Sequence, residues 1–104
     1  MKREELLEHV KQTVHDIEPD AEIILYGSRA RDDAHAESDW DFLILLDGVV
    51  DDARTDSIRH RLYEIEWDCG EVLSSIVRSR QEWDTPLHQV TPFSKVVREQ
   101  GILI

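Results

Sequence analysis

Residues 23–46 read IILYGSRARDDAHAESDWDFLILL and contain the strongest structural signals of the sequence. Two short apolar runs, 23–26 and 42–46, stand at its ends, and a glycine-containing turn follows each of them. Continuous apolar runs of this length are typical of strands that are covered on both faces. Between the runs lie a Gly-Ser turn, a short helical segment and a polar loop. We therefore predict the order strand, turn, short helix, loop and strand.

An acidic pair, Asp39 and Asp41, stands just before the second apolar run. Side chains alternate along a strand, so both carboxylates should share one face, and Trp40 should point to the other face as a core residue. Neighbouring carboxylates raise each other's pKa unless a cation lies between them. Proteins hold Mg²⁺ or Mn²⁺ with one or two carboxylates and substrate phosphates. Asp39 and Asp41 are therefore candidate metal ligands and catalytic residues.

The Gly-Ser turn supplies groups that suit a phosphate. Gly27 permits a sharp turn and a close approach of the backbone, because it has no Cβ. Ser28 is predicted to cap the short helix, which leaves N–H groups that favour an anion, and its hydroxyl can donate to a phosphate oxygen. Arg29 and Arg31 add positive charge nearby. Taken singly, a Gly-Ser turn is ordinary loop chemistry and an Asp-x-Asp is often a solvated strand end.

Together these features resemble a known signature. Gly-Ser, ten residues and Asp-x-Asp, in a strand–turn–helix–loop–strand setting, resemble the signature of the minimal nucleotidyltransferases, a branch of the DNA polymerase β-like superfamily. The similarity covers 27–46 and continues over 70–104, and so nearly the entire chain. The resemblance implies a nucleotidyltransferase fold, with ATP or another nucleoside triphosphate as substrate and Mg²⁺ or Mn²⁺ as cofactor. The metal would lie on Asp39 and Asp41, and the nucleotide on Gly27, Ser28, Arg29 and Arg31.

The resemblance also implies a partner. Stand-alone minimal nucleotidyltransferases pair with a small HEPN-domain protein and act as its antitoxin by adenylylating it. The expected reaction is therefore transfer of a nucleoside monophosphate, AMP from ATP, to a hydroxyl of such a protein. A housekeeping transferase acting on an antibiotic or another small molecule is a further alternative, but such enzymes need an added domain for the acceptor.

One departure from the family pattern concerns the third strand, predicted over 71–77. Many polymerase β-like enzymes carry a third carboxylate there, which serves as the base for the attacking hydroxyl. Here Ser74 or Ser75 occupies the matching place, and a serine takes no proton at neutral pH. Glu71 is a possible substitute. The alternative function is therefore a catalytically weak or inactive nucleotide-binding module, which neutralises its HEPN partner by contact alone.

The remaining elements follow from periodicity and turn residues. We predict amphipathic helices over 2–17 and 50–68, with Cys69 as a small core residue. A helical turn over 79–84 is capped by Ser79, and Thr85-Pro86 ends it. The last helix begins at Thr91-Pro92 and ends at Gly101. The apolar tail 102–104 should pack on the core or contact a partner. The class is α/β: a small mixed sheet with helices packed against it.

Size and charge set limits on the function. A chain of 104 residues forms one domain, 1–104, with a modest core. Its net charge is −11 and it has no Lys/Arg cluster, which argues against binding of free nucleic acid and favours a basic protein partner or simple solubility. No membrane-spanning stretch or signal-peptide core appears. Its single cysteine cannot form an internal disulfide, so we expect a cytoplasmic protein. His35, in the polar loop, is a possible contact for nucleotide or partner.

Overall fold

The sheet forms the centre of the molecule in the computed structural model, which describes residues 2–31 and 38–104. Within these residues it has four strands in the order β3-β2-β1-β4, namely β1 (Glu22–Tyr26), β2 (Trp40–Leu46), β3 (Leu73–Ser79) and β4 (Ile102–Leu103). β2 runs antiparallel to β1 and parallel to β3, and β4 runs antiparallel to β1. The predicted α/β class with a mixed sheet is therefore confirmed.

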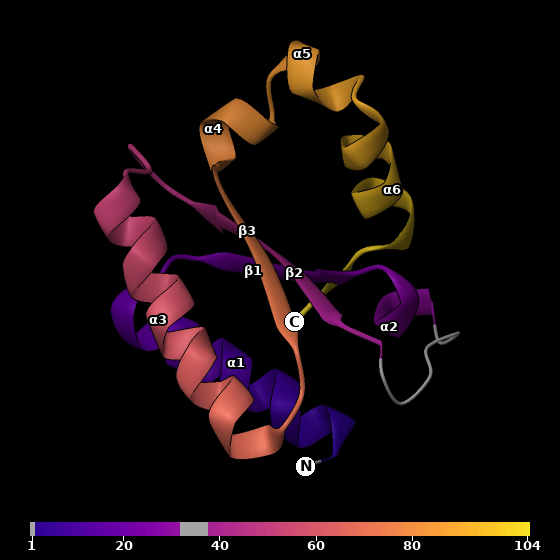
Figure 1. Ribbon diagram of the computed structural model, residues 1–104. Helices are drawn as coiled ribbons and strands as arrows, with labels where there is room; N and C mark the ends of the chain where they lie inside the picture. The colour runs from indigo at the N-terminus through magenta and orange to yellow at the C-terminus, as the bar shows by residue number, and fades with distance from the viewer. Residues whose placement is uncertain (1, 32–37) are drawn as a thin grey trace.

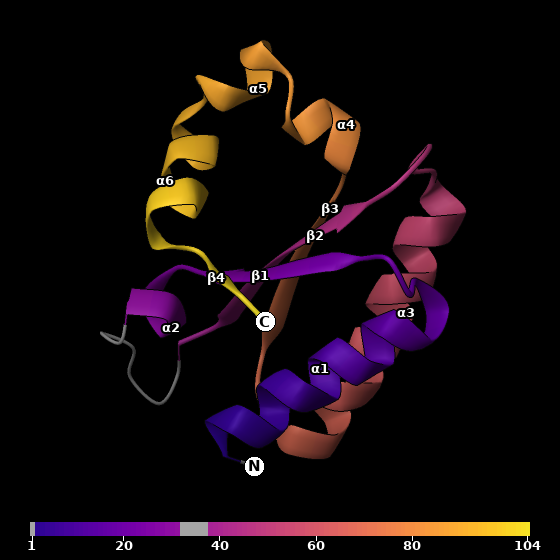
Figure 2. The ribbon, with the colours of Figure 1, turned by 180° about the vertical axis from the view of Figure 1, so that it is seen from behind.

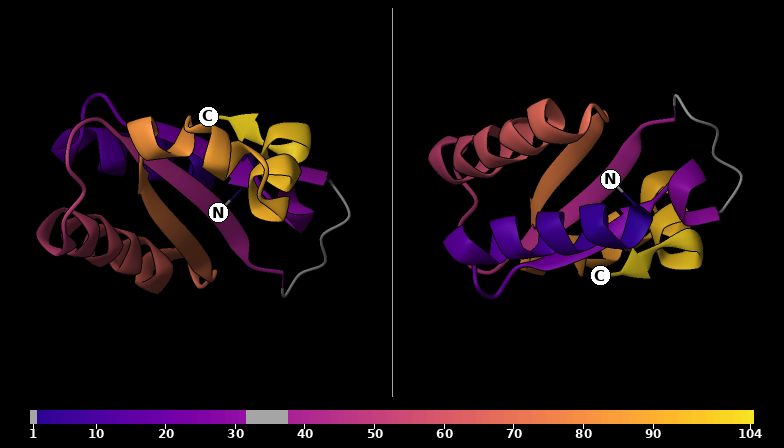
Figure 3. Two further views of the ribbon diagram at one scale, coloured as in Figure 1. Left: turned by 90° about the horizontal axis from the view of Figure 1, so that it is seen from above. Right: turned by 90° about the horizontal axis from the view of Figure 1, so that it is seen from below.

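Helices cover both faces of the sheet. Two long helices lie side by side on one face, and three short ones arc over the other, as Figures 1 and 2 show from opposite sides. The long ones are α1 (Arg3–Ile17) and α3 (Asp52–Cys69), and the short ones are α4 (Arg80–Trp83), α5 (Pro86–Gln89) and α6 (Pro92–Gln100). A single turn, α2 (Ser28–Arg31), follows β1. The views from above and below show the same layers (Figure 3).

Strand β2 lies at the centre of the core. Phe42, Ile44 and Leu46 face α1 and α3, whereas Leu43 and Leu45 face α4 and α6. All five side chains are buried. A strand covered on both faces needs apolar side chains at odd and even positions alike, which is why its sequence is a continuous apolar run rather than an alternating one.

Local sequence signals set the helix boundaries. Asp51 accepts a hydrogen bond from the N–H of Arg54 and begins α3, and Gly70, with φ of +72°, ends it. Ser79 and Thr91 cap α4 and α6 as predicted. Such side chains satisfy N–H groups that the first helical turn leaves without an intrahelical acceptor.

Several predicted boundaries differ from those observed. β2 begins at Trp40, because the Trp40 N–H already bonds to the Val72 carbonyl at 2.9 Å. β3 begins at Leu73 rather than at Glu71, since the chain needs the residues after Gly70 to turn back towards the sheet. Thr85-Pro86 was expected only to end a helix, but it begins α5 in the way that Thr91-Pro92 begins α6. Thr at the cap and Pro at the first helical position favour a helix start.

The apolar tail at 102–104 adds to the sheet. Ile102 and Leu103 pair with Leu25 and Ile24 of β1, and the Ile104 N–H bonds to the Ile23 carbonyl at 3.0 Å. Of the two expected roles of this tail, packing on the core holds for Ile104, whereas the side chains of Ile102 and Leu103 stay exposed and their backbone extends the sheet. In the part of the chain that the structure describes, no helix has both the length and the apolar character needed to cross a bilayer.

Candidate functional site

The candidate site lies where β1 ends and β2 begins. Asp41 stands opposite Tyr26 of β1 and Ser74 of β3 in the strand register. Because side chains alternate along β2, Asp41 shares the face of Leu43 and Leu45, the one covered by α4 and α6. Asp39 directly precedes β2 and is exposed, whereas Asp41 is partly buried.

The electrostatics of Asp41 indicate that the two carboxylates lie close together. Burial raises the pKa of Asp41, and the negative charge of Asp39 raises it further. Burial, followed by the charge of Asp41, likewise raises the pKa of the Tyr26 phenol. A divalent cation between the carboxylates would oppose this effect, since an opposite charge favours the ionised form. The two carboxylates therefore suit a hard divalent cation, which would relieve their repulsion.

Gly27 is packed directly against the carboxylate of Asp41. Its φ is +79°, which side chains with a Cβ rarely adopt, and a Cβ built on it would lie 2.5 Å from Asp41 Oδ2. A glycine at this position thus allows the turn and leaves space for the carboxylate. The Gly-Ser turn and the acidic pair, which lie ten residues apart in the sequence, are therefore in contact.

Ser28 is the first residue of α2, not its cap. The Gly27 carbonyl accepts hydrogen bonds from the N–H groups of Ala30 at 3.0 Å and Arg31 at 3.1 Å, so Gly27 precedes the helix and the predicted cap was wrong. Among the described residues, the Ser28 hydroxyl has no hydrogen-bond partner. It is partly exposed beside the turn, and so can donate to a phosphate oxygen.

Arg29 holds the start of β2. Its guanidinium lies 4.4 Å from the centre of the Trp40 ring and donates to the Ser38 carbonyl at 3.0 and 3.2 Å. It also lies 3.6 Å from Glu71 Oε2. The Trp40 side chain is only 5% exposed and belongs to the core beneath α1 and α3, as the alternation predicted. The guanidinium of Arg29 is thus already in contact with Trp40, Ser38 and Glu71. A contact between Arg29 and a phosphate stays a prediction.

Arg31 lies at the exposed end of α2. Its guanidinium donates to Gln100 Oε1 of α6 at 3.0 Å, which ties the turn after β1 to the last helix. His35, named above as a possible contact, lies outside the described residues.

The third strand places a serine beside the acidic pair. Ser74 is in register with Asp41 and shares its face, whereas Ser75 points to the opposite face, towards α3. Glu71 Oε2 accepts a hydrogen bond from Trp40 Nε1 at 3.3 Å and so lies on the face away from Asp41. The possible substitution of Glu71 for the third carboxylate is therefore not supported. In the described ranges, no group of three His, Cys, Asp or Glu side chains could hold a metal.

Two residues near the site were missed in the sequence. Tyr26 makes an edge-to-face contact with Phe93 of α6, with ring centroids 5.3 Å apart. Tyr26 is the last residue of the strand that leads into the Gly-Ser turn, and it pairs with Asp41 in the register. Its position next to the turn was the sequence signal that it belongs to the site. Gln100 gave no signal, because its partner Arg31 is 69 residues away.

Comparisons with known proteins identify a family and a similar fold. The family model described as "Nucleotidyltransferase domain" matches residues 4–97. A solved structure, described as a crystal structure of a toxin-antitoxin with AMP-PNP, is similar with a TM-score of 0.66 and 15% sequence identity. The likeness covers 92% of this chain and 69% of that chain. No curated protein matches.

Proposed function

This chain belongs to the nucleotidyltransferase domain family, and from that premise we propose that it transfers AMP from ATP to a hydroxyl of a partner protein. The observation that carries the proposal is the contact between Gly27 and Asp41. A Cβ at the turn would meet the Asp41 carboxylate at 2.5 Å, which supports one site made of the turn proposed to bind phosphate and the carboxylates proposed to bind metal.

The residues of this site would divide the work. Asp39 and Asp41 would hold Mg²⁺ or Mn²⁺, and the Ser28 hydroxyl would donate to the triphosphate. Arg31, exposed at the end of α2, would add positive charge. When bound, the divalent cation would neutralise negative charge on the phosphates. The acceptor hydroxyl would lose its proton to water and its oxygen would bond to the α-phosphorus. The bond from that phosphorus to the oxygen bridging the α- and β-phosphates would break, so that pyrophosphate leaves.

Proton removal limits this reaction. Ser74 is in register with Asp41, at the place where a base would be needed, and it takes no proton at neutral pH. A tyrosine phenol, with a pKa of about 10, ionises far more readily than an aliphatic alcohol. We therefore propose that the acceptor is a tyrosine presented by the cognate partner, and that generic acceptors are modified slowly or not at all.

The proposed partner is a HEPN-domain toxin, which the chain would neutralise as an antitoxin. The sequence signature supports the pairing with a HEPN protein, and the fold likeness to a toxin-antitoxin structure with the ATP analogue AMP-PNP supports the antitoxin role. The proposed compartment is the cytoplasm, where ATP is available and a single free cysteine such as Cys69 stays reduced.

Label transfer tests the enzyme. Purified HEPN partner is incubated with α-labelled ATP and Mg²⁺, together with wild type or with the Asp39→Asn, Asp41→Asn double variant. Label should appear on the partner with wild type only, and the double variant should remain folded by circular dichroism. Absence of label with wild type would contradict the proposal.

A second candidate function is a binding module without transfer activity. The serine in register with Asp41 favours it, because a site without a base can still bind nucleotide. The same experiment separates the two functions. If the double variant neutralises the toxin as fully as wild type does, and neither labels it, then the chain acts by contact alone.

A further inference from the structure

We propose that the groove between α3 and the outer edge of β3 binds an extended segment of a partner protein, which pairs with β3 as an additional strand. This peptide site is separate from the acidic pair and needs neither nucleotide nor metal. It rests on the proposed function only insofar as its occupant would be the protein that is modified.

The first observation is the open edge of the sheet. β3 is an edge strand of seven residues. In a parallel pair, every second residue of a strand directs its N–H and C=O groups to the neighbouring strand. The Trp40 N–H bonds to the Val72 carbonyl, so in β3 the backbone groups of the even-numbered residues bond to β2. The N–H and C=O groups of Leu73, Ser75 and Val77 therefore point outwards.

The ends of this edge are closed and its middle is open. Glu66 Oε1 accepts from the Leu73 N–H at 3.0 Å, and the Val77 carbonyl accepts from Arg78 Nη1 at 2.9 Å. Within the described part of the chain, neither the N–H nor the C=O of Ser75 has a hydrogen-bond partner. Protein sheets usually cover or disrupt such edges, so an open position beside a pocket suits strand addition.

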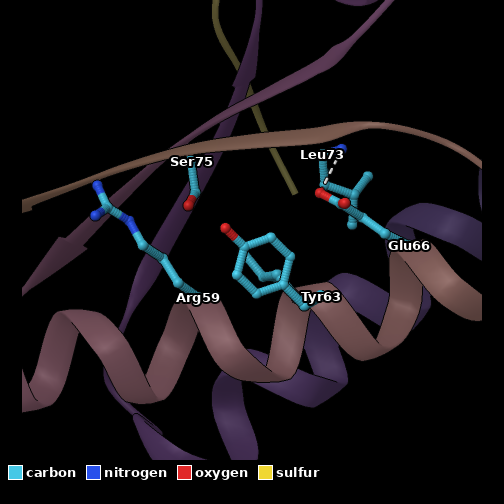
Figure 4. Close-up of a pocket in the computed structure, with 6 residues that line it drawn as sticks. Arg59, Tyr63, Glu66, Leu73 and Ser75 are labelled. Carbon is cyan, nitrogen blue, oxygen red and sulfur yellow. Dashed lines mark hydrogen bonds between the residues drawn. The ribbon is translucent and has the colours of Figure 1, made fainter.

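The second observation is a pocket between that edge and the side chains of α3. Figure 4 looks into the groove, with β3 above and α3 below, and shows Arg59, Tyr63 and Glu66 rising from α3 towards Leu73 and Ser75. These residues and Leu62 line a pocket of about 220 Å³. Because Ser75 points towards α3, a strand residue opposite Ser75 would direct its side chain into this pocket. The buried Leu62 and Leu73 make the pocket suitable for an apolar side chain.

The third observation is that the pocket beneath Ser75 carries a cation at one end and an anion at the other, Arg59 and Glu66. Arg59 has no ion-pair partner among the described residues, although Asp51, Asp52 and Glu82 line the neighbouring hollow at the Val77 end, together with Arg59 and Arg78. Glu66 and Glu71 lie at the other end, beside the exposed Trp67. An antiparallel occupant would therefore read, from its N-terminus, acidic residue, any residue, apolar residue, any residue, basic residue. A rim of exposed side chains extends the contact area: Tyr63 is 58% exposed, Trp67 88% and Val72 55%.

A single strand suits this groove better than a second copy of the chain does. A second copy would bring its own 18-residue α3 to the same edge, where it would compete for the space beneath the paired strands. It would also bring together two chains that each carry a net charge of −11.

The probe is the synthetic heptapeptide Thr-Glu-Thr-Leu-Thr-Lys-Thr with blocked ends. It is titrated into ¹⁵N-labelled full chain without nucleotide, and amide shifts are followed by NMR. We expect saturable shifts at Ser75, Leu73 and Tyr63, with a Kd below about 1 mM, the weak range for a short peptide. Methylation of the peptide's Leu nitrogen should abolish binding, because it removes the hydrogen bond to the Ser75 carbonyl.

Charge reversal tests the direction of the strand. Arg59→Glu should weaken binding of this peptide at least tenfold, and exchanging the peptide's Glu for Lys should restore it. Lys95→Glu is the matched control: it makes the same charge change at an exposed position of α6, on the other face of the sheet, and should leave affinity unchanged.

Three outcomes would overturn the proposal: no shifts at about 1 mM peptide, shifts confined to residues outside the groove, or equal affinity for wild type and Arg59→Glu. A dimer in sedimentation, with the Ser75 amide protected in the absence of peptide, would assign the edge to a second copy instead. Asp39→Asn should bind the peptide as wild type does. Failure of nucleotide transfer is thereby distinguished from failure of peptide binding.

Discussion

At the scale of a single residue, Asp41 holds an ionisable carboxylate in a partly buried position, where burial disfavours its charge. Its strand position buries it beside Tyr26, and this burial together with Asp39 raises its pKa. Gly27 leaves room for its carboxylate, which a side chain at that turn would displace. Carboxylates with a raised pKa are common in functional sites. A bound cation stabilises the ionised form, and so relieves the unfavourable effect of burial and of the neighbouring carboxylate.

Gly27→Ala should damage nucleotide binding more than Arg31→Ala does. The added Cβ would sit at φ +79° and displace the Asp41 carboxylate, so both the turn proposed to bind phosphate and the proposed metal ligand would be disturbed. We expect at least about a tenfold loss of affinity, or ~1.4 kcal/mol. Calorimetric titration with a non-hydrolysable ATP analogue and Mg²⁺ measures it. Equal affinities for wild type and Gly27→Ala would mean that the phosphates bind elsewhere.

Asp41→Asn should stabilise the metal-free protein at pH 7. Because the folded pKa of Asp41 lies above its unfolded value, the folded state binds more protons between the two values. The free energy of unfolding of wild type therefore falls as the pH rises through that window, and the fall is complete above the folded pKa. The variant lacks this fall, so it should gain on the order of 0.5 kcal/mol at pH 7.

Urea denaturation in the presence of a chelator, from acidic to neutral pH, tests this expectation. Added Mg²⁺ should stabilise wild type and leave Asp41→Asn unchanged. A variant that is less stable than wild type at pH 7 would show that Asp41 is a structural residue.

At the scale of elements, Arg54 joins the end of α1 to the start of α3. Its guanidinium makes two hydrogen bonds to the Glu18 carboxylate, at 2.7 and 2.9 Å, and two more to the carbonyls of Asp47 and Val49. One side chain thus fixes the turn after β2 against the loop that precedes β1. The hydrogen bond from Arg54 holds the pKa of Glu18 below its usual range, against the opposing effect of burial.

Arg54→Met should lower the free energy of unfolding at pH 7 by about 1–2 kcal/mol, the scale of hydrogen bonds to a charged group. A lowered folded pKa means that the contribution of Glu18 is present above its unfolded pKa and is lost as the pH falls through the folded pKa. The difference between wild type and variant should therefore narrow in acid.

Denaturation in urea at neutral and acidic pH measures this difference. Arg61→Met is the control, since within the described residues Arg61 forms only an exposed pair with Asp16 at 3.5 Å, and it should cost less than about 0.5 kcal/mol. A difference for Arg54→Met that stays constant with pH would show that its carbonyl contacts, rather than Glu18, carry the effect.

At the scale of the whole molecule, net charge opposes folding. The chain carries −11, and compaction brings like charges closer together. Ion pairs such as Arg80 with Asp47 at 2.8 Å offset this locally, but the acidic residues outnumber the basic ones 23 to 12. Added salt screens the repulsion over distances longer than the ion pairs span.

We therefore expect the free energy of unfolding to rise by on the order of 1 kcal/mol between about 0.02 M and 0.5 M NaCl. Thermal denaturation at pH 7 gives the comparison, with an uncharged osmolyte at matched osmolality as the control. A decrease with salt would mean that the ion pairs outweigh the net repulsion.

The sequence alone determined the central strands and the acidic pair. The run 42–46 is apolar at every position and the run 23–26 at all but Tyr26, which predicts strands with two covered faces. Alternation then predicted Asp39 and Asp41 on one face and Trp40 in the core, and the buried Trp40 is confirmed. These are local properties, set by the residues themselves and their neighbours in the chain. The N-caps of α4 and α6, Ser79 and Thr91, were likewise predicted from local sequence.

Which distant groups meet depends on how the separate elements pack together. Ser74 rather than Ser75 lies beside Asp41, because the register of β3 depends on how α3 packs and where Gly70 ends it. One residue of slip would exchange the two faces. Arg29 of α2 contacts Trp40 and Ser38, at the start of β2, because these two elements pack together. Such pairings depend on the packing of the whole chain, which no local pattern specifies.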